Sequence, residues 1–181
     1  MPGWMWIMTA ECAGFGESIA EMEAVLLGTE NVDAFLRDLA VLAARSVDED
    51  LSCAIMLQRG AVPRAVASSD VMASEVDELQ YSLGTGPCLH AMRSGERVCV
   101  DDLVFDQRWW EYALRAVARG VRSSLSIPLS AQGSSVGAMN LYSDHPDFFG
   151  EARRWRAEQF AAEASIAVGL AARLADQTEP L

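Results

Sequence analysis

The chain has 181 residues, of which 51% are hydrophobic, and its formal net charge is −12 at pH 7. This length and apolar content predict one globular domain with its own core. The acidic charge and the scattered basic residues argue against a nucleic-acid surface and an anionic membrane, because both need clustered Lys and Arg. No stretch reaches the roughly 18 apolar residues of a membrane span, so we expect no membrane partner.

The four cysteines are Cys12, Cys53, Cys88 and Cys99. They come without a secretory signal, since the N-terminal segment MPGWMWIM has no positive region and too short an apolar run. Reduced thiols in a cytoplasmic protein are the simplest interpretation of this pattern.

In chain order, residues 1–16 lack a clear period and predict a flexible tail. Helical spacing of apolar residues predicts one helix that ends at Gly28 and a second one after an N-cap at Asn31. Two strands follow at residues 51–58 and 62–67, joined by a turn, which is a hairpin pattern. Residues 69–79 carry several acids, and we expect them to form an exposed helix.

The turn Gly84-Thr85-Gly86-Pro87 predicts the start of a short helix over 88–94, with an extended segment at 96–100. Residues 105–119 have helical spacing. Strands are predicted at 121–129 and 136–142, and Pro128 should lie near a strand end, at a bulge or on an edge, because it cannot donate to a ladder. The last helix is predicted at 155–175, with residues 176–181 as a tail.

Residues 160–172 of that last helix are apolar except for Glu163 and Ser165. One sheet cannot cover so wide an apolar surface, so the helix needs a second partner, either the first helix or another subunit. We therefore expect a homodimer. The predicted elements together indicate an α+β fold, a central antiparallel sheet flanked by helices, in a single domain over residues 17–175.

The stretch YSLGTGPCL, which begins at Tyr81, resembles the loop-to-helix segment of GAF domains, especially bacterial ones that precede an RNA-binding ANTAR domain. The resemblance continues in order through VCVDDL, DQRW, GVRSSLSIPL and GAMNLY and covers roughly residues 30–175. It implies a GAF-like fold whose long N- and C-terminal helices pack together. It also implies a sensory or regulatory module that signals through dimerising terminal helices. No ANTAR-like segment follows, so we expect the output to lie on another chain or the protein to act alone.

In GAF domains that bind small molecules, the pocket lies between the sheet and the segment that matches Tyr81–Asp102 here. Asn140 and Tyr142 add a polar pair to a strand face expected to include Val136 and Ala138, and an amide and a phenol that face inward need partners, from a ligand, the backbone or water. The resemblance and these residues give the following ligand-binding candidates, for a small molecule or a protein signalling partner: Tyr81, Cys88, Trp109, Leu125, Ile127, Asn140 and Tyr142.

Cys88 and Cys99 bracket a short helix and a turn, so their thiols could approach each other. This spacing is similar to that of another GAF-fold family, the thiol-dependent free methionine-(R)-sulfoxide reductases. Those enzymes carry a further cysteine in the region that reads Trp109–Ser126 here, and this region has none. We therefore expect no enzyme and no catalytic residues, with Cys88 and Cys99 as small buried hydrophobic residues or, alternatively, as a redox pair.

A metal site built from Cys88, His90 and Cys99 is disfavoured, because residues two apart on a helix point in different directions. The sequence thus predicts no metal and requires no cofactor. A third interpretation is an interaction module with a filled core, in which dimer exchange is the function.

Overall fold

The structure, a computed structural model, describes residues 32–59, 62–131 and 134–178. The predicted tail at 1–16, the first predicted helix and the N-cap at Asn31 lie outside the described residues. So do the turn at residues 132–133 and the end of the predicted C-terminal tail.

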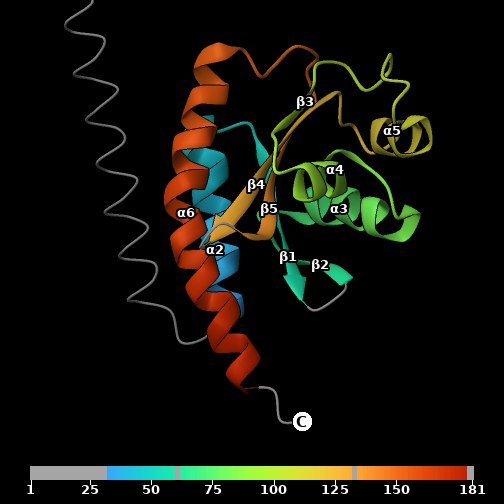
Figure 1. Ribbon diagram of the computed structural model, residues 1–181. Coiled ribbons are helices and arrows are strands. Elements are labelled where there is room, and N and C mark those ends of the chain that lie inside the picture. The colour runs from blue at the N-terminus through green and yellow to red at the C-terminus, as the bar shows by residue number, and fades with distance from the viewer. Residues whose placement is uncertain (1–31, 60–61, 132–133, 179–181) are drawn as a thin grey trace, which may run out of the picture.

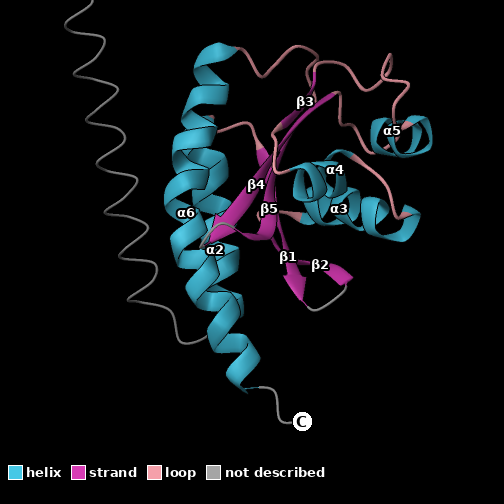
Figure 2. Cartoon of the chain, viewed as in Figure 1, coloured by secondary structure: helices cyan, strands magenta, loops and turns pink. Residues whose placement is uncertain are grey.

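The centre of the molecule is one antiparallel sheet with five strands in the order β2-β1-β5-β4-β3 (Figure 2). Its strands are β1 (Ser52–Arg59), β2 (Val62–Ser68), β3 (Val98–Val100), β4 (Ser123–Ala131) and β5 (Ser134–Ser143). The two predicted hairpins are confirmed as β1–β2 and β4–β5, and β5 then pairs with β1 to join them at the centre of the sheet.

The helices cover both faces of this sheet (Figure 1). On one face lie α2 (Val32–Val47) and α6 (Glu151–Thr178), and on the other lie α3 (Val71–Leu83), α4 (Pro87–Ser94) and α5 (Trp110–Val117). Three layers result, with the sheet in the middle. The predicted α+β class with a GAF-like antiparallel sheet is confirmed.

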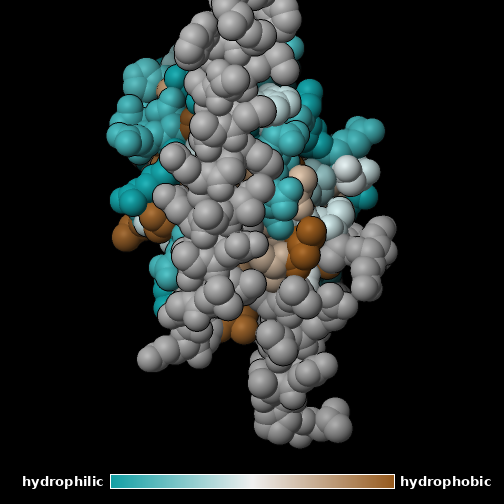
Figure 3. Space-filling view, turned by 90° about the vertical axis from the view of Figure 1, so that its left-hand side faces the viewer, coloured by the Kyte–Doolittle hydropathy of each residue, from teal (hydrophilic) through white to brown (hydrophobic). Residues whose placement is uncertain are grey.

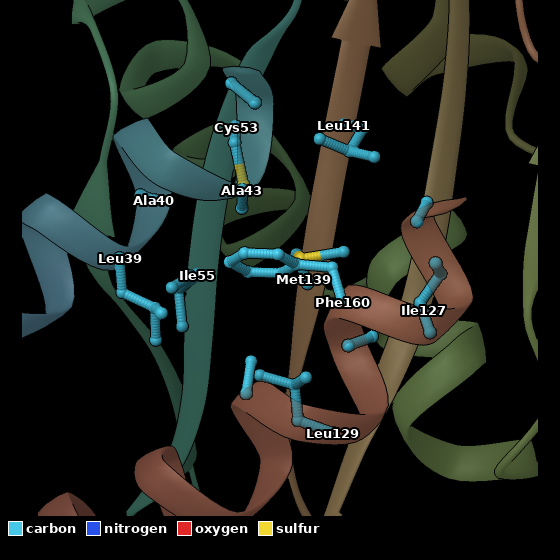
Figure 4. Packing of buried hydrophobic residues seen from close by; sticks show 14 of the residues in the cluster. Leu39, Ala40, Ala43, Cys53, Ile55, Ile127, Leu129, Met139, Leu141 and Phe160 are labelled. Atoms are coloured by element: carbon cyan, nitrogen blue, oxygen red, sulfur yellow. The ribbon is translucent and has the colours of Figure 1, made fainter. Parts of the chain in front are cut away.

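Alternation along the strands gives the sheet two different faces. The face toward α2 and α6, called the apolar face below, carries a cluster of buried apolar side chains (Figure 4). The sheet contributes to it Cys53, Ile55, Leu57, Leu125, Ile127, Leu129, Met139 and Leu141. The helices add buried residues such as Leu39 and Phe160, so this layer forms the largest hydrophobic core cluster among the described residues.

The apolar side of α6 packs against both the sheet and α2. Helix α2, the second predicted helix, thus covers part of the apolar surface of α6, and the expected packing of N- and C-terminal helices against each other is confirmed. Where described residues are visible on this side of the molecule, hydrophilic residues surround separate hydrophobic ones (Figure 3), and Ile166 of α6 is 66% exposed. No described helix has the length and apolar character needed to cross a membrane.

Three predicted helices differ from the structure. Helix α3 runs on to Leu83, past the predicted end, and it is not an exposed helix, because it buries Ala73, Val76, Asp77, Leu79 and Gln80. Helix α5 begins at Trp110, since the residues before it form turns. Helix α6 extends through Thr178. Pro128 follows the prediction: it lies beyond the last β3 partner, Ser126, and next to the register shift at Leu129/Ser130.

Candidate functional site

The sheet face opposite to the apolar face carries a buried group of polar side chains. We call Asp77, Gln80, Tyr112, Asn140 and Tyr142 the polar cluster. Helix α3 supplies the first two, α5 supplies Tyr112, and the central strand β5 supplies the last two. All five side chains are closed off from solvent, with at most 1% of any of them exposed.

Local sequence explains how α3 brings two polar side chains into this interior. Asp70 caps the helix, because its carboxylate accepts a hydrogen bond from the Ala73 N–H at 2.8 Å. Gly84 ends the helix in the left-handed conformation, with φ 66°. Between these caps, positions 73, 76, 77 and 80 follow helical spacing and form one stripe that faces the sheet. Two of the four residues on that stripe are Asp77 and Gln80.

Asp77 is the centre of the cluster. Its Oδ1 accepts hydrogen bonds from the Tyr142 hydroxyl at 2.5 Å, the Asn140 Nδ2 at 2.8 Å and the Gln80 Nε2 at 3.4 Å. Burial raises the pKa of Asp77 from 3.8 to about 6, and these three hydrogen bonds offset part of the increase. The carboxyl group is therefore poised to exchange a proton close to neutral pH.

Gln80 connects the cluster to the start of α4. Its Oε1 accepts a hydrogen bond from the Cys88 N–H at 2.8 Å, and its Nε2 also donates to the Tyr142 hydroxyl at 3.1 Å. A side chain thus caps one of the free N–H groups at the helix N-terminus. Gly86 makes room for it, since a Cβ at this position would lie 2.4 Å from the Gln80 Oε1.

Several buried polar atoms of this region have no hydrogen-bond partner among the described residues. They are Asp77 Oδ2, Asn140 Oδ1, and the hydroxyls of Tyr112, Ser124 and Ser126. Burial raises the pKa of Tyr112, and the nearby Tyr142 hydroxyl offsets part of this increase, although the two hydroxyls do not meet hydrogen-bond geometry. Ser124 and Ser126 of β4 stand directly opposite Tyr142 and Asn140 of β5, so they share the same face. Unsatisfied buried polar atoms are costly and rare, and their concentration here marks a candidate binding site.

The structure brings together three of the predicted ligand-binding residues. Asn140 and Tyr142 are members of the polar cluster, and Cys88 touches it through its backbone N–H. Trp109 lies at the margin, where it is half-buried against the hydrophobic cluster that includes Tyr112 and Tyr142. Tyr81 is 43% exposed and lies at the surface.

Leu125 and Ile127 lie elsewhere. Both side chains belong to the apolar face, with Ile127 packed near Phe160 and Leu129 (Figure 4). The alternation along β4 sends Ser124 and Ser126 toward the polar cluster instead. Val136 also departs from the expected row, since it packs with the apolar face near the register shift between β4 and β5. The candidate site therefore does not include these residues.

The structure does not bring the two candidate redox cysteines together. Cys88 packs on the α4 side of the sheet, with its Sγ 3.6 Å from the Met56 Sδ, whereas Cys99 packs against the apolar face. Burial raises the pKa of the Cys88 thiol well above 9.0, and burial with the nearby Asp101 raises that of Cys99 to about 11. Both effects disfavour the thiolate form, which is the nucleophile.

Asp77, Gln80 and Tyr112 were absent from the sequence-based candidates. A signal for the first two was present, because their helical stripe carries Ala73 and Val76 as well. An acid and an amide on the apolar stripe of a helix are expected to be buried and partnered. Tyr112 lies on the buried side of α5, but nothing in the sequence connects it to Asp77.

A family model described as a GAF domain matches residues 29–169. The chain belongs to the GAF domain family. Among the described residues, no group of three or more His, Cys, Asp or Glu side chains could hold a metal ion. A search of curated proteins finds no match.

Solved GAF structures resemble the chain over most of its length. The GAF domain of an Acinetobacter phosphoenolpyruvate-protein phosphotransferase matches with a TM-score of 0.66 and 15% identity, covering 90% of this chain and 97% of the other. A Burkholderia vietnamiensis protein described as a GAF sensor matches with a TM-score of 0.67 and 15% identity, covering 90% and 98%. A free methionine-R-sulfoxide reductase from Neisseria meningitidis matches with a TM-score of 0.63 and 18% identity, covering 89% and 91%.

The last match corrects one prediction. We expected the chain not to be an enzyme, yet three free methionine-R-sulfoxide reductases, from N. meningitidis, Thermoplasma acidophilum and Staphylococcus aureus, share its fold. The same fold thus serves sensory modules and enzymes, and it does not exclude catalysis. At identities of 18%, 17% and 11%, these likenesses show the fold alone.

Proposed function

We propose that this protein is a cytoplasmic GAF-type regulatory module that binds a small molecule at the polar cluster and signals through its terminal helices as a homodimer. The observation that carries the proposal is the group of buried polar atoms without partners: Asp77 Oδ2, Asn140 Oδ1 and the Tyr112 hydroxyl. A protein retains such costly groups where a bound ligand satisfies them. The likeness of its motifs to GAF domains that precede ANTAR domains supports a regulatory role.

Strand β5 provides a route from the ligand to the helices. Asn140 and Tyr142 point into the polar cluster. Their chain neighbours Met139 and Leu141 point the other way and pack with α2 and α6 on the apolar face. A ligand that shifts this central strand changes the surface on which both helices lie. Packed cores respond to such shifts by moving between discrete arrangements, which is how a small change at a site reaches an interface.

The experiment is native mass spectrometry of the purified chain, followed by denaturing mass spectrometry of the same sample. We expect a dimer that carries a non-covalent small molecule, which is released on denaturation. Tyr142→Phe removes one hydroxyl from the cluster and should lower the bound fraction, whereas Tyr81→Phe makes the same chemical change at an exposed position. A chain that carries nothing, and whose melting temperature no small molecule raises, would overturn the proposal.

A further inference from the structure

We propose that the ligand of this site presents a positively charged N–H donor group, such as an ammonium, amidinium or guanidinium, to the Asp77 Oδ2 and the Asn140 Oδ1. The inference rests on the proposed function, since it names the ligand class of the same site. It follows from which atoms are left without partners, what charge they carry and which groups surround them.

Three donors of the cluster converge on one atom. The Tyr142 hydroxyl, the Asn140 Nδ2 and the Gln80 Nε2 point at the Asp77 Oδ1. This leaves the second carboxylate oxygen and the amide oxygen of Asn140 without any donor among the described residues. A carboxylate oxygen and an amide oxygen only accept hydrogen bonds, so the missing partner must donate.

The two orphan oxygens belong to neighbouring functional groups. The 2.8 Å hydrogen bond between the Asn140 Nδ2 and the Asp77 Oδ1 joins the other halves of the same two functional groups. An amidinium or guanidinium presents several N–H donors in one plane and matches such a pair of acceptors. A single ammonium can also donate to both, because it carries three hydrogens.

The charge of the surroundings favours a cation. The titratable side chains that respond to Asp77 are Cys53, Cys88, Tyr112 and Tyr142, from β1, α4, α5 and β5, and none of them is basic. Within the part of the chain that the structure describes, no Arg or His contributes to the pKa of Asp77. A buried carboxylate without a cation is strongly disfavoured, and a cationic ligand provides the missing charge.

An anionic ligand fits poorly. Its natural place is the N-terminus of α4, but Gln80 already caps the Cys88 N–H there. The neighbouring Asp77 would repel an anion whenever it is ionised. The hydroxyls of Tyr112, Ser124 and Ser126 can donate or accept, so they suit the uncharged remainder of the molecule.

The test uses four probes with the same short chain and different head groups: n-butylguanidinium, n-butylammonium, n-butanol and butyrate. The full chain is titrated with each at pH 7.5 while its melting temperature is recorded. We expect the two cations to raise the melting temperature and the alcohol and the carboxylate to have little effect. Asp77→Asn should weaken n-butylguanidinium binding at least tenfold, while Glu78→Gln, an exposed acid one residue away on α3, should leave it unchanged.

A second measurement does not depend on any variant folding. n-Butylguanidinium keeps its charge across the accessible pH range, so a change in its binding between pH 5 and pH 7.5 reports the protein. Because binding requires ionised Asp77, whose pKa is about 6, we expect the affinity to rise about tenfold over this range. n-Butanol, which has no charge, controls for changes in the protein itself.

The outcomes separate the two proposals. Stronger stabilisation by butyrate, cation binding that Asp77→Asn leaves intact, or a co-purified ligand without a basic nitrogen would overturn the inference and leave the proposed function standing. The absence of binding by all four probes together with an empty native mass spectrum would overturn both.

Discussion

The two faces of the sheet bury different kinds of side chain, although the same five strands form both. On the apolar face, the buried sheet positions are mostly hydrophobic, and α2 and α6 cover them with further apolar side chains. On the opposite face, the corresponding positions of β4 and β5 carry Ser124, Ser126, Asn140 and Tyr142, and α3 adds an acid and an amide.

This difference indicates that the apolar face stabilises the fold and that the polar face serves a specific function. Burial of apolar surface stabilises a fold without any demand on geometry, so the apolar face can hold the domain together. The polar cluster buries groups that lose water and regain only part of their hydrogen bonds, so it costs stability. Real proteins keep such a local conflict at functional sites, and the rest of the fold compensates.

The largest effect is expected from damage to the apolar face. Phe160 of α6 is buried there among residues of the sheet (Figure 4). Phe160→Ala should lower the free energy of unfolding by about 3–5 kcal/mol, because it removes a large side chain and leaves a cavity. Chemical denaturation monitored by circular dichroism measures this change.

Ile166→Ala is the matched control for this prediction, since Ile166 lies on the same helix with its side chain 66% exposed. Its cost should stay within about 0.5 kcal/mol. If the two variants were equally stable, Phe160 would not be buried between α6 and the sheet as the structure shows. A loss of stability at Ile166 comparable to that at Phe160 would instead indicate that another subunit covers the outer side of α6.

The second prediction concerns the polar cluster and the pH. Folding raises the pKa of Asp77 from 3.8 to about 6, so the folded chain holds this proton more tightly than the unfolded chain does. The resulting stabilisation is fully present below pH 4 and is lost as the pH rises through about 6. A pKa difference of about two corresponds to on the order of 3 kcal/mol.

Urea denaturation of the ligand-free chain at a series of pH values between 4 and 7.5 measures this dependence. Asp77→Asn should flatten the curve, because the variant has no proton to exchange at this position, whereas Glu78→Gln should retain the slope of the wild-type chain. The raised pKa would be contradicted if the free energy of unfolding of the wild-type chain rose with pH by a similar amount while that of Asp77→Asn stayed flat.

Periodicity predicted most of the fold. The alternation in β4 and the hairpin with β5 follow directly from the sequence, and so do the glycine-bounded helix α4 and the long apolar helix α6. These features depend on short-range spacing, which one sequence displays. The packing of α2 on α6 was implied by the family resemblance and not by spacing, because it depends on a contact between segments more than a hundred residues apart.

The site was predicted only in part, for a related reason. Asn140 and Tyr142 stood out because a polar pair interrupts an apolar row, but Asp77 was assigned to an exposed helix on the strength of the acids around it. Leu125 and Ile127 were placed at the site although alternation requires Ser124 and Ser126 to face the opposite way. Alternation separates the leucine and isoleucine from the two serines. Which of the two sets faces α3 depends on the path of the chain between the strands, and residue spacing does not reveal that path.

The smallest effect is expected at the entrance of α4. Gly86 has φ 152° and ψ 171°, a conformation that is close to exclusive to glycine. A Cβ there would also lie 2.7 Å from the Gln80 Cγ, and Gln80 is held in place by its hydrogen bonds to Cys88 and Tyr142. Gly86→Ala should therefore cost about 2–3 kcal/mol, from backbone strain and from displacement of Gln80.

Gly84→Ala separates these two causes, since Gly84 has φ 66° but nothing within 4 Å of an added Cβ. It should cost only about 1 kcal/mol, the strain of a left-handed alanine. Combining Gly86→Ala with Gln80→Ala relieves the clash, so the two changes should cost less together than the sum of their separate effects in a double-mutant cycle. Strict additivity would show that Gln80 does not press on Gly86 in solution and that the polar cluster is not closed by this contact.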